Sequence, residues 1–271
     1  MVKREVFSPT GWEKSLAPIR ENAGVVAEYH RTLERLVDAM SNEIEEIISK
    51  AYRRAEGKIV QDSSPMAGLR DAVAEMTRKW EEKFDNLSPD IAKRFVKQAD
   101  EHSQRSTRAR LKSAGIAIEF RPTRRMQDII SAAVSENTKL IKSISDEYLD
   151  DVAGIVNRGI MEGHNLGKIT EDLKARYHIT HRRAALIARQ ESRNANTAMN
   201  RARQLDLGIE EGEWVHSGGG REPRESHVAA GRKRLRFKLT EGAYIDGEYI
   251  MPGQKINCRC NWRPVLRGWN D

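Results

Sequence analysis

Apolar residues recur every three or four positions through the first two thirds of the chain, the spacing that places them on one face of an α-helix. The first such stripe runs from Val25 to Tyr52, and others follow over Leu69–Phe84, Ile91–Ala99 and Asp128–Met161. Stripes of this kind usually pack against other helices rather than around a cofactor. The pattern therefore predicts a mainly α N-terminal region built from long helices.

Helix-breaking residues set the expected ends of the first helices. The segment Lys58–Gly68 contains Gly, Pro and Ser and is typical of a connector. Ser88 is a good N-cap and Pro89 a good first helical residue. We therefore expect a separate helix to begin there and to continue to about Gly115.

Two more helices are expected before the C-terminal part. Ile169–Tyr177 predicts a short helix, and Thr180 is expected to cap a longer helix from His181 to about Leu205. Upstream of both, Ile116–Phe120 alternates briefly between apolar and other residues, which predicts a short strand or an extended crossing.

After Gly208 the chain becomes rich in Gly, Pro, Trp and Tyr, and short apolar segments alternate with turn signals. This pattern predicts short strands. Asp246-Gly247 is a strong hairpin signal between the last two strands. The expected strands are Trp214-Val215, Leu235–Phe237, Ala243–Ile245 and Glu248–Met251.

The expected fold is thus a mainly α N-terminal region followed by a small α+β C-terminal domain. We expect a helical N-terminal region over residues 1–120, a helical connector over 121–180 and the α+β domain over 181–271. No apolar run approaches the roughly 18 residues of a membrane span. The first residues also lack the apolar core of a signal peptide.

The chain is basic overall, with 47 Lys and Arg against 40 Asp and Glu and a net charge of +7. Such an excess favours an acidic partner, although most of the charge lies on helices of mixed sign. Four basic residues close together on a candidate strand could contact phosphates. The alternative is a charged strand edge that discourages pairing with other chains. These residues are Arg232, Lys233, Arg234 and Arg236.

The sequence contains no P-loop, no GxGxxG nucleotide motif, no GxSxG elbow and no HExxH zinc pair. It does contain two cysteines, Cys258 and Cys260, which are too close in sequence for a relaxed disulfide and are expected to be reduced. In an extended segment both sulfurs point to the same face. Together with His227 and His216 they could form a structural zinc site. The alternatives are small buried thiols or, with less support, a Cys–His nucleophile.

Glu191 is a further candidate for chemistry, on the helix that enters the C-terminal part. Facing Arg224 and His227, it could act as the general base of a nuclease or transferase. The alternative is a buried ion pair that fixes the loop around Arg224, which is the more common role of such a residue.

The order of these residues resembles the phage Mu protein F-like family of head-morphogenesis, or minor capsid, proteins. The resemblance covers about residues 150–265. The chain departs from the family at Gly218–Gly220, where many members carry an acidic residue, and after Phe237, where a usual Asp-Pro pair is missing. The matching elements are Ile187-Ala188-Arg189-Gln190-Glu191, Trp214, Arg224-Glu225-Ser226-His227, Gly231, Pro252 and Cys258-Arg259-Cys260.

The resemblance implies a virion component that is made in the host cytoplasm and acts without catalysis. It implies association with the portal protein in the interior of the procapsid, and a role in head assembly and in DNA packaging or ejection. Scaffold protein, major capsid protein and packaged DNA are further implied partners. It assigns structural roles to the family-motif residues Arg189, Glu191, Trp214, Arg224, His227, Gly231 and Pro252. A nuclease-like enzyme and a DNA-binding module without catalysis remain the alternatives.

Overall fold

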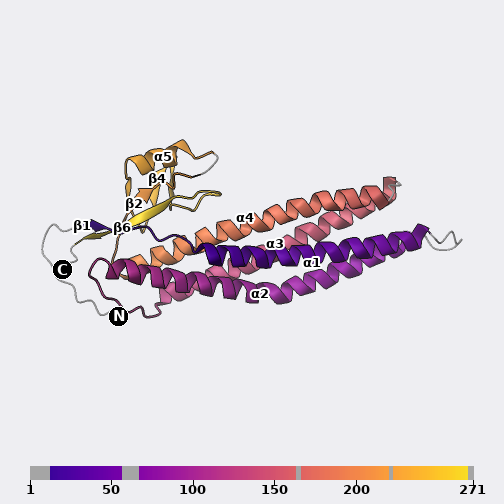
Figure 1. Cartoon of the computed structure of the whole chain (residues 1–271), viewed down its shortest axis with the longest axis horizontal. Helices are drawn as coiled ribbons and strands as arrows, with labels where there is room; N and C mark the ends of the chain where they lie inside the picture. Colours follow the sequence, from indigo (N-terminus) through magenta and orange to yellow (C-terminus); the bar gives the residue numbers. More distant parts are fainter. Residues whose placement is uncertain (1–12, 57–66, 163–165, 220–221, 268–271) are drawn as a thin grey trace. The chain divides into compact units, whose positions relative to one another are not determined.

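The computed structural model describes residues 13–56, 67–162, 166–219 and 222–267. After one short N-terminal strand come four long helices, and a region of short antiparallel strands with one short helix follows (Figure 1). The predicted fold class is confirmed. The long helices are α1 (Ala23–Glu56), α2 (Ala67–Lys112), α3 (Arg124–Glu162) and α4 (Leu166–Asp206).

The chain forms two compact units, each assembled from segments that are distant in sequence. The helical unit combines residues 27–93 and 134–189. The mixed unit combines the chain up to residue 26, residues 94–133 and the chain from residue 190 onward. All four long helices therefore contribute residues to both units.

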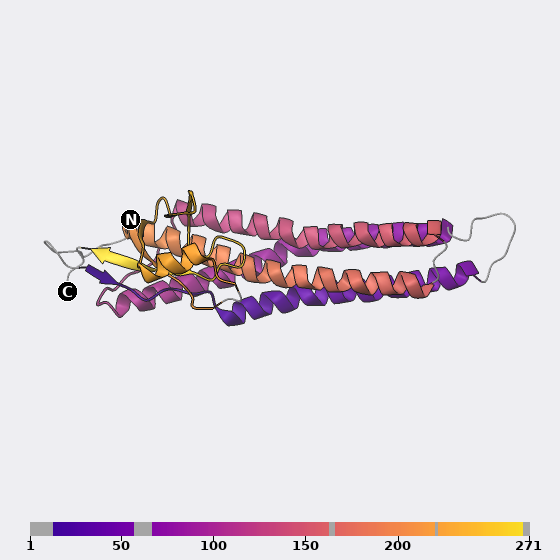
Figure 2. The same cartoon turned by 90° about the horizontal axis from the view of Figure 1, so that it is seen from above.

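The helical unit confirms the predicted apolar stripes. In α1 the buried residues Tyr29, Leu33, Val37, Met40 and Ile44 follow one face at three- and four-residue spacing. Hydrogen bonds between side chains join the helical segments, which run beside one another in both views (Figures 1 and 2). Among the described residues, no helix is both long enough and apolar enough to cross a bilayer.

The predicted helix start at Ser88 and Pro89 is wrong, because both residues lie inside α2. Ser88 is fully buried and donates its hydroxyl hydrogen bond to the Phe84 carbonyl at 2.5 Å, so it does not cap a helix. It lies on the same face as the buried Trp80, Phe84 and Ala92, at four-residue spacing. Packing of this continuous face outweighs the one backbone hydrogen bond that a proline removes.

The predicted break at Thr180 is also wrong, since α4 is continuous through it. Thr180 is buried, and its hydroxyl donates to the Arg176 carbonyl at 3.2 Å. A threonine inside a helix commonly bonds the carbonyl four residues earlier. The same side-chain oxygen that suggests a cap in the sequence is therefore used within the helix.

Helices α2 and α4 end in the same way, at a glycine with a positive φ. The φ angle is 85° at Gly115 and 75° at Gly208. After each glycine an isoleucine N–H bonds a carbonyl five residues back, Ile116 to Leu111 at 2.9 Å and Ile209 to Gln204 at 2.8 Å. This is the Schellman arrangement, in which glycine avoids the cost of a left-handed conformation.

The segment from Ile116 to Phe120 is not a strand. Instead, Ile116, Ile118 and Phe120 pack against the core of the mixed unit. The alternating apolar residues are therefore those whose side chains enter this core. The backbone of the segment is not part of a β-sheet.

The mixed unit contains a four-stranded antiparallel sheet in the order β1-β6-β2-β3, and a separate β4–β5 hairpin. The turn at Asp246 and Gly247 has φ angles of 54° and 83°, as a two-residue hairpin of mirror-image type requires. The predicted strands and this turn are confirmed, whereas β1, β6 and α5 were not predicted. The elements are β1 (Glu13–Ser15), β2 (Glu211–Val215), α5 (Glu225–Arg232), β3 (Arg236–Lys238), β4 (Ala243–Ile245), β5 (Glu248–Ile250) and β6 (Asn261–Arg267).

A buried histidine–cysteine cluster as the candidate functional site

His227, Cys258 and Cys260 come together in the interior of the mixed unit. One potential ligand atom from each residue lies within 4.8 Å of the other two. Nδ1 of His227 is 3.4 Å from Sγ of Cys258 and 3.8 Å from Sγ of Cys260. The three residues are only 3%, 4% and 8% exposed. Histidine and cysteine are the side chains that most often bind zinc in proteins, so this cluster is the candidate metal site.

Local backbone geometry explains why the three side chains converge. Cys258 and Cys260 flank the exposed Arg259 immediately before β6, so the two sulfurs share the inner face of the segment. His227 lies on the buried face of α5 with Ala230. The helix thus places the His227 imidazole next to the two cysteine thiols.

Gly231 lets α5 approach β2 closely. A Cβ atom at residue 231 would lie 2.5 Å from the Cβ of His216 and 2.9 Å from its backbone nitrogen. No side chain can be accommodated at such distances without movement of the backbone. The glycine therefore fixes how near His227 lies to the end of β2.

The two thiols have opposite electrostatic environments. A hydrogen bond from the Cys260 side chain lowers the pKa of the Cys258 thiol to about 5, and the N–H groups of Cys260 and Gly253 act in the same direction. The pKa of Cys260 is raised, first because its thiol is the donor to Cys258 and second because it is buried. The Cys258 thiol is therefore the more acidic of the pair.

Trp214 covers the cluster from β2. Its ring meets the His227 ring edge-on, with centroids 5.1 Å apart. Its indole N–H is buried and has no hydrogen bond of normal geometry among the described residues. This N–H, together with the Ser217 backbone N–H, lowers the pKa of the Cys260 thiol against the three larger effects that raise it.

The loop that precedes Cys258 is held by a polar stripe on α4. The Gln190 side chain accepts a hydrogen bond from the Asn257 N–H at 3.0 Å and donates to the Gly253 carbonyl at 3.4 Å. Two turns later, Thr197 donates its hydroxyl hydrogen to the Pro252 carbonyl at 3.3 Å. Helix α4 therefore positions the cysteines through the backbone of this loop.

The comparison with known protein families finds a match over the part of the chain that contains the cluster. The family described as Phage Mu protein F like protein matches residues 150–263. Residues 150–263 are thus similar to this family. The match points to a phage head-related protein. It confirms the family resemblance drawn from the order of the motif residues.

The chain also matches a curated relative from Haemophilus influenzae that is named as an uncharacterized protein. The two are 27% identical over 261 residues, which is 93% of this chain and 56% of the relative. The chain thus spans little more than half the length of that relative. No solved structure matches.

The other motif residues have different roles. Arg189 is exposed on α4, and Glu191 accepts a hydrogen bond from the Asn194 amide at 2.8 Å. Arg224 donates to the Ile256 carbonyl at 3.3 Å, whereas His227 faces the cysteines. The described contacts of the suggested nuclease residues Glu191, Arg224 and His227 therefore go to different groups.

His216, the fourth expected metal ligand, is not a member of the three-residue cluster found among the described residues. Its Nδ1 accepts a hydrogen bond from the Gly218 N–H at 3.1 Å. The side chain is thus used in the turn that follows β2.

The basic residues near β3 divide into two pairs. Arg232 and Lys233 are exposed at the end of α5. Arg234 lies 3.8 Å from the Glu213 carboxylate, and Arg236 makes a two-pronged ion pair with Glu13. The hydrogen bond with Glu13 raises the pKa of Arg236. Two of the four expected phosphate contacts are therefore balanced by carboxylates within the chain.

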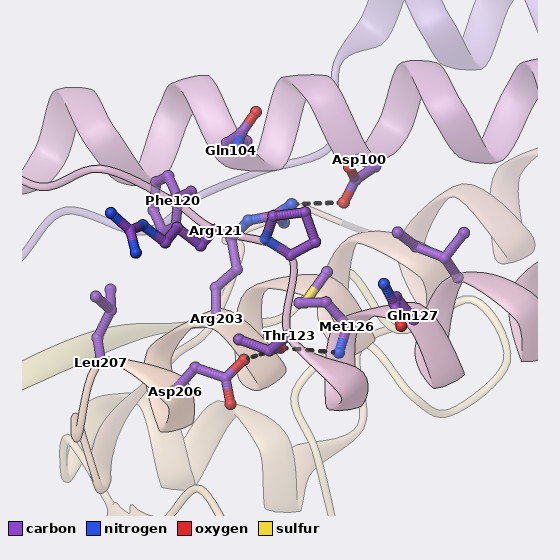
Figure 3. Close-up of a pocket in the computed structure, with 12 residues that line it drawn as sticks. Asp100, Gln104, Phe120, Arg121, Thr123, Met126, Gln127, Arg203, Asp206 and Leu207 are labelled. Carbon is purple, nitrogen blue, oxygen red and sulfur yellow. Dashed lines mark hydrogen bonds and ion pairs between the residues drawn. The ribbon is translucent and has the colours of Figure 1, made fainter. Parts of the chain in front are cut away.

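A separate pocket of about 150 Å³ lies elsewhere in the mixed unit, beside the Arg203–Asp100 ion pair (Figure 3). Thr123 closes one side by donating its hydroxyl hydrogen to Asp206 at 2.6 Å and by accepting the Met126 N–H at 3.1 Å. Thr123 therefore caps α3 while tying its start to the end of α4.

Sequence reasoning missed the residues of α4 that hold the loop, Gln190 and Thr197, and Asn194, which accepts a hydrogen bond from the Gln190 amide. Their signal is their spacing: positions 190, 194 and 197 share one helical face. Polar residues of modest helix propensity on one face of an otherwise well-patterned helix indicate contacts to the backbone of another segment.

Proposed function

We propose that this chain is a minor head protein of a bacteriophage, that it associates with the portal protein inside the procapsid, and that it acts in head assembly and in DNA packaging or ejection. The observation that carries the proposal is the Mu F-like match over residues 150–263, which includes α4, the cluster and most of the small sheet. In this function the cluster and its loop stabilise the module and do not react.

The β4–β5 hairpin supplies a surface for the portal contact. Tyr244 and Tyr249 are 62% and 59% exposed, and their rings lie 5.1 Å apart. Aromatic side chains are enriched at protein interfaces because they bury a large area with few rotatable bonds. The hairpin is the part of the mixed unit that presents two such side chains together.

The test is quantitative mass spectrometry of purified particles from the phage that encodes the chain, comparing procapsids with mature virions. We expect a few copies per particle, near portal stoichiometry, in procapsids. Absence from both kinds of particle would overturn the proposal. Loss from mature virions only would favour a role that ends with head assembly or packaging, and would exclude a role in ejection.

A second experiment tests the portal contact directly. We expect the portal protein to co-purify with the wild-type chain, and the Tyr244→Ala, Tyr249→Ala double variant to bind it more weakly. Ile179→Ala is the matched control, because it removes an exposed apolar side chain from the helical unit. Equal binding by the double variant and the control would contradict the assignment of the hairpin.

The proposed contact with packaged DNA can be tested separately. Arg232 and Lys233 are exposed at the end of α5, where they could meet packaged DNA. Each phosphate contact lowers log affinity by about 0.9 for each tenfold rise in salt. Fluorescence anisotropy with duplex DNA should therefore show a salt slope that decreases in the Arg232→Ala, Lys233→Ala variant. No binding at low salt would remove DNA from the partners.

A further inference from the structure

We propose that His227, Cys258 and Cys260 bind one zinc ion through Nδ1 and the two Sγ atoms. The bound zinc ion would link α5 to the segment that leads into β6. This inference does not depend on the function in the phage head.

The spacing of the three atoms fits tetrahedral zinc. Bonds of about 2.3 Å to sulfur and about 2.0 Å to nitrogen place a sulfur about 3.5 Å from the nitrogen of the same site. The two nitrogen–sulfur separations here are 3.4 and 3.8 Å. The atoms are thus close to their coordinating positions, and binding needs only small side-chain rotations.

The surroundings of the sulfurs also fit thiolate ligands. Both cysteine thiols are buried. The Trp214 N–H is also buried and has no hydrogen-bond partner among the described residues, and its ring packs edge-on against the His227 ring. Donors of this kind orient metal-bound thiolates and stabilise their charge.

Three protein ligands leave one tetrahedral position, which we assign to a water molecule. His216 is not a ligand in this assignment, because its Nδ1 is used by the Gly218 N–H and it lies outside the three-residue group. A fourth ligand from a solvent molecule is common where zinc has three protein ligands.

The experiment uses the full chain purified under reducing conditions. We expect about one zinc per chain by elemental mass spectrometry. Replacement of zinc by cobalt should give the visible bands of tetrahedral Co(II) and a sulfur-to-cobalt charge-transfer band. Folded wild-type protein that contains no zinc and gives no cobalt spectrum would overturn the proposal.

Variants then identify the ligands. Cys258→Ser, Cys260→Ser and His227→Gln should each lose the metal, whereas the matched control His216→Gln should keep one zinc per chain. Loss of zinc in His216→Gln, with folding retained by circular dichroism, would overturn the three-ligand assignment.

Thiol accessibility in the wild-type chain provides a readout that does not depend on whether a variant folds. Zinc should protect both cysteines from a thiol reagent, and a chelator should restore their reaction and lower the melting temperature. Equal thiol reactivity with and without the chelator would also contradict the site.

Discussion

The Gln190 side-chain oxygen accepts the backbone N–H of Asn257 at 3.0 Å, although the two residues are far apart in sequence. Asn257 has a φ angle of 61°, so the chain turns sharply just before Cys258. The Gln190 amide nitrogen also reaches the carbonyls of Gly253 and Gln254, at 3.4 and 3.5 Å. One side chain of α4 thus fixes both ends of the turn that delivers the cysteines.

Replacing Gln190 should therefore loosen this loop. We expect Gln190→Leu to lower the free energy of unfolding by about 0.5–1.5 kcal/mol, because the partly buried Asn257 N–H loses its acceptor. Urea unfolding measures this loss. Arg189→Ala, at the neighbouring exposed position, is the control and should change stability by less than about 0.5 kcal/mol. Equal effects of the two substitutions would show that the loop does not depend on Gln190.

The same loop contact should affect the metal site. Because Gln190 positions the backbone and not the ligands themselves, Gln190→Leu should weaken zinc binding without abolishing it. Competition with a chelator gives the affinity, and we expect a loss of about 10- to 100-fold, as for other supporting residues. Unchanged affinity would mean that the cysteines are held by their own strand alone.

Gly231 offers a test of the close approach between α5 and β2. A methyl group there would meet His216 at 2.5 Å, so we expect Gly231→Ala to cost about 1–3 kcal/mol of stability. The matched control is Gly68→Ala in α2, where nothing lies within 4 Å of the added Cβ. Alanine should stabilise that helical position by about 0.5–1 kcal/mol. Thermal melting of both variants checks the difference in sign.

The sequence was sufficient for those parts of the structure that depend on periodic patterns. The apolar stripes predicted the long helices, and the Asp246-Gly247 dipeptide predicted the hairpin, because helix faces and tight turns are local properties. The spacing of Cys258 and Cys260 likewise placed both sulfurs on one face. His227 joined them as expected, whereas His216 did not.

What the sequence did not reveal depends on contacts between distant segments. Ser88 and Thr180 both look like caps, but each donates instead to a carbonyl of its own helix because the apolar face continues past it. The role of Gln190 requires the loop around Asn257 to lie against α4. Short strands such as β1, with three residues, carry too little pattern to be recognised alone.

The Arg203–Asp100 ion pair should be important for the mixed unit. Arg203 is 5% exposed, and burial lowers its pKa while Asp100 acts in the opposite direction. Removing one partner of a buried pair leaves the other charge without compensation, so Arg203→Met should cost about 3 kcal/mol. Lys93→Met is the control, because the Lys93–Asp90 pair is exposed and should contribute about 0–1 kcal/mol. Chemical denaturation should separate the two variants clearly.

Ionisation of Tyr177 should make the free energy of unfolding depend on pH in the alkaline range. Its hydroxyl donates to the Asp38 carboxylate at 2.8 Å, and this hydrogen bond raises its pKa from 10.0 to about 12. The folded-state pKa lies above the unfolded value, so the contribution to stability is complete below pH 10.0 and is lost as the pH rises through about 12. Tyr177→Phe removes this contribution.

The stability difference between wild type and Tyr177→Phe should therefore shrink across this pH range. Denaturant unfolding at a series of pH values measures it, and the near-ultraviolet absorbance of tyrosinate follows the ionisation directly. Tyr249→Phe, on the exposed hairpin, is the control and should leave the pH dependence unchanged. A Tyr177→Phe difference that stays constant from pH 10 to 12 would show that the hydrogen bond to Asp38 does not hold the phenol in its protonated form.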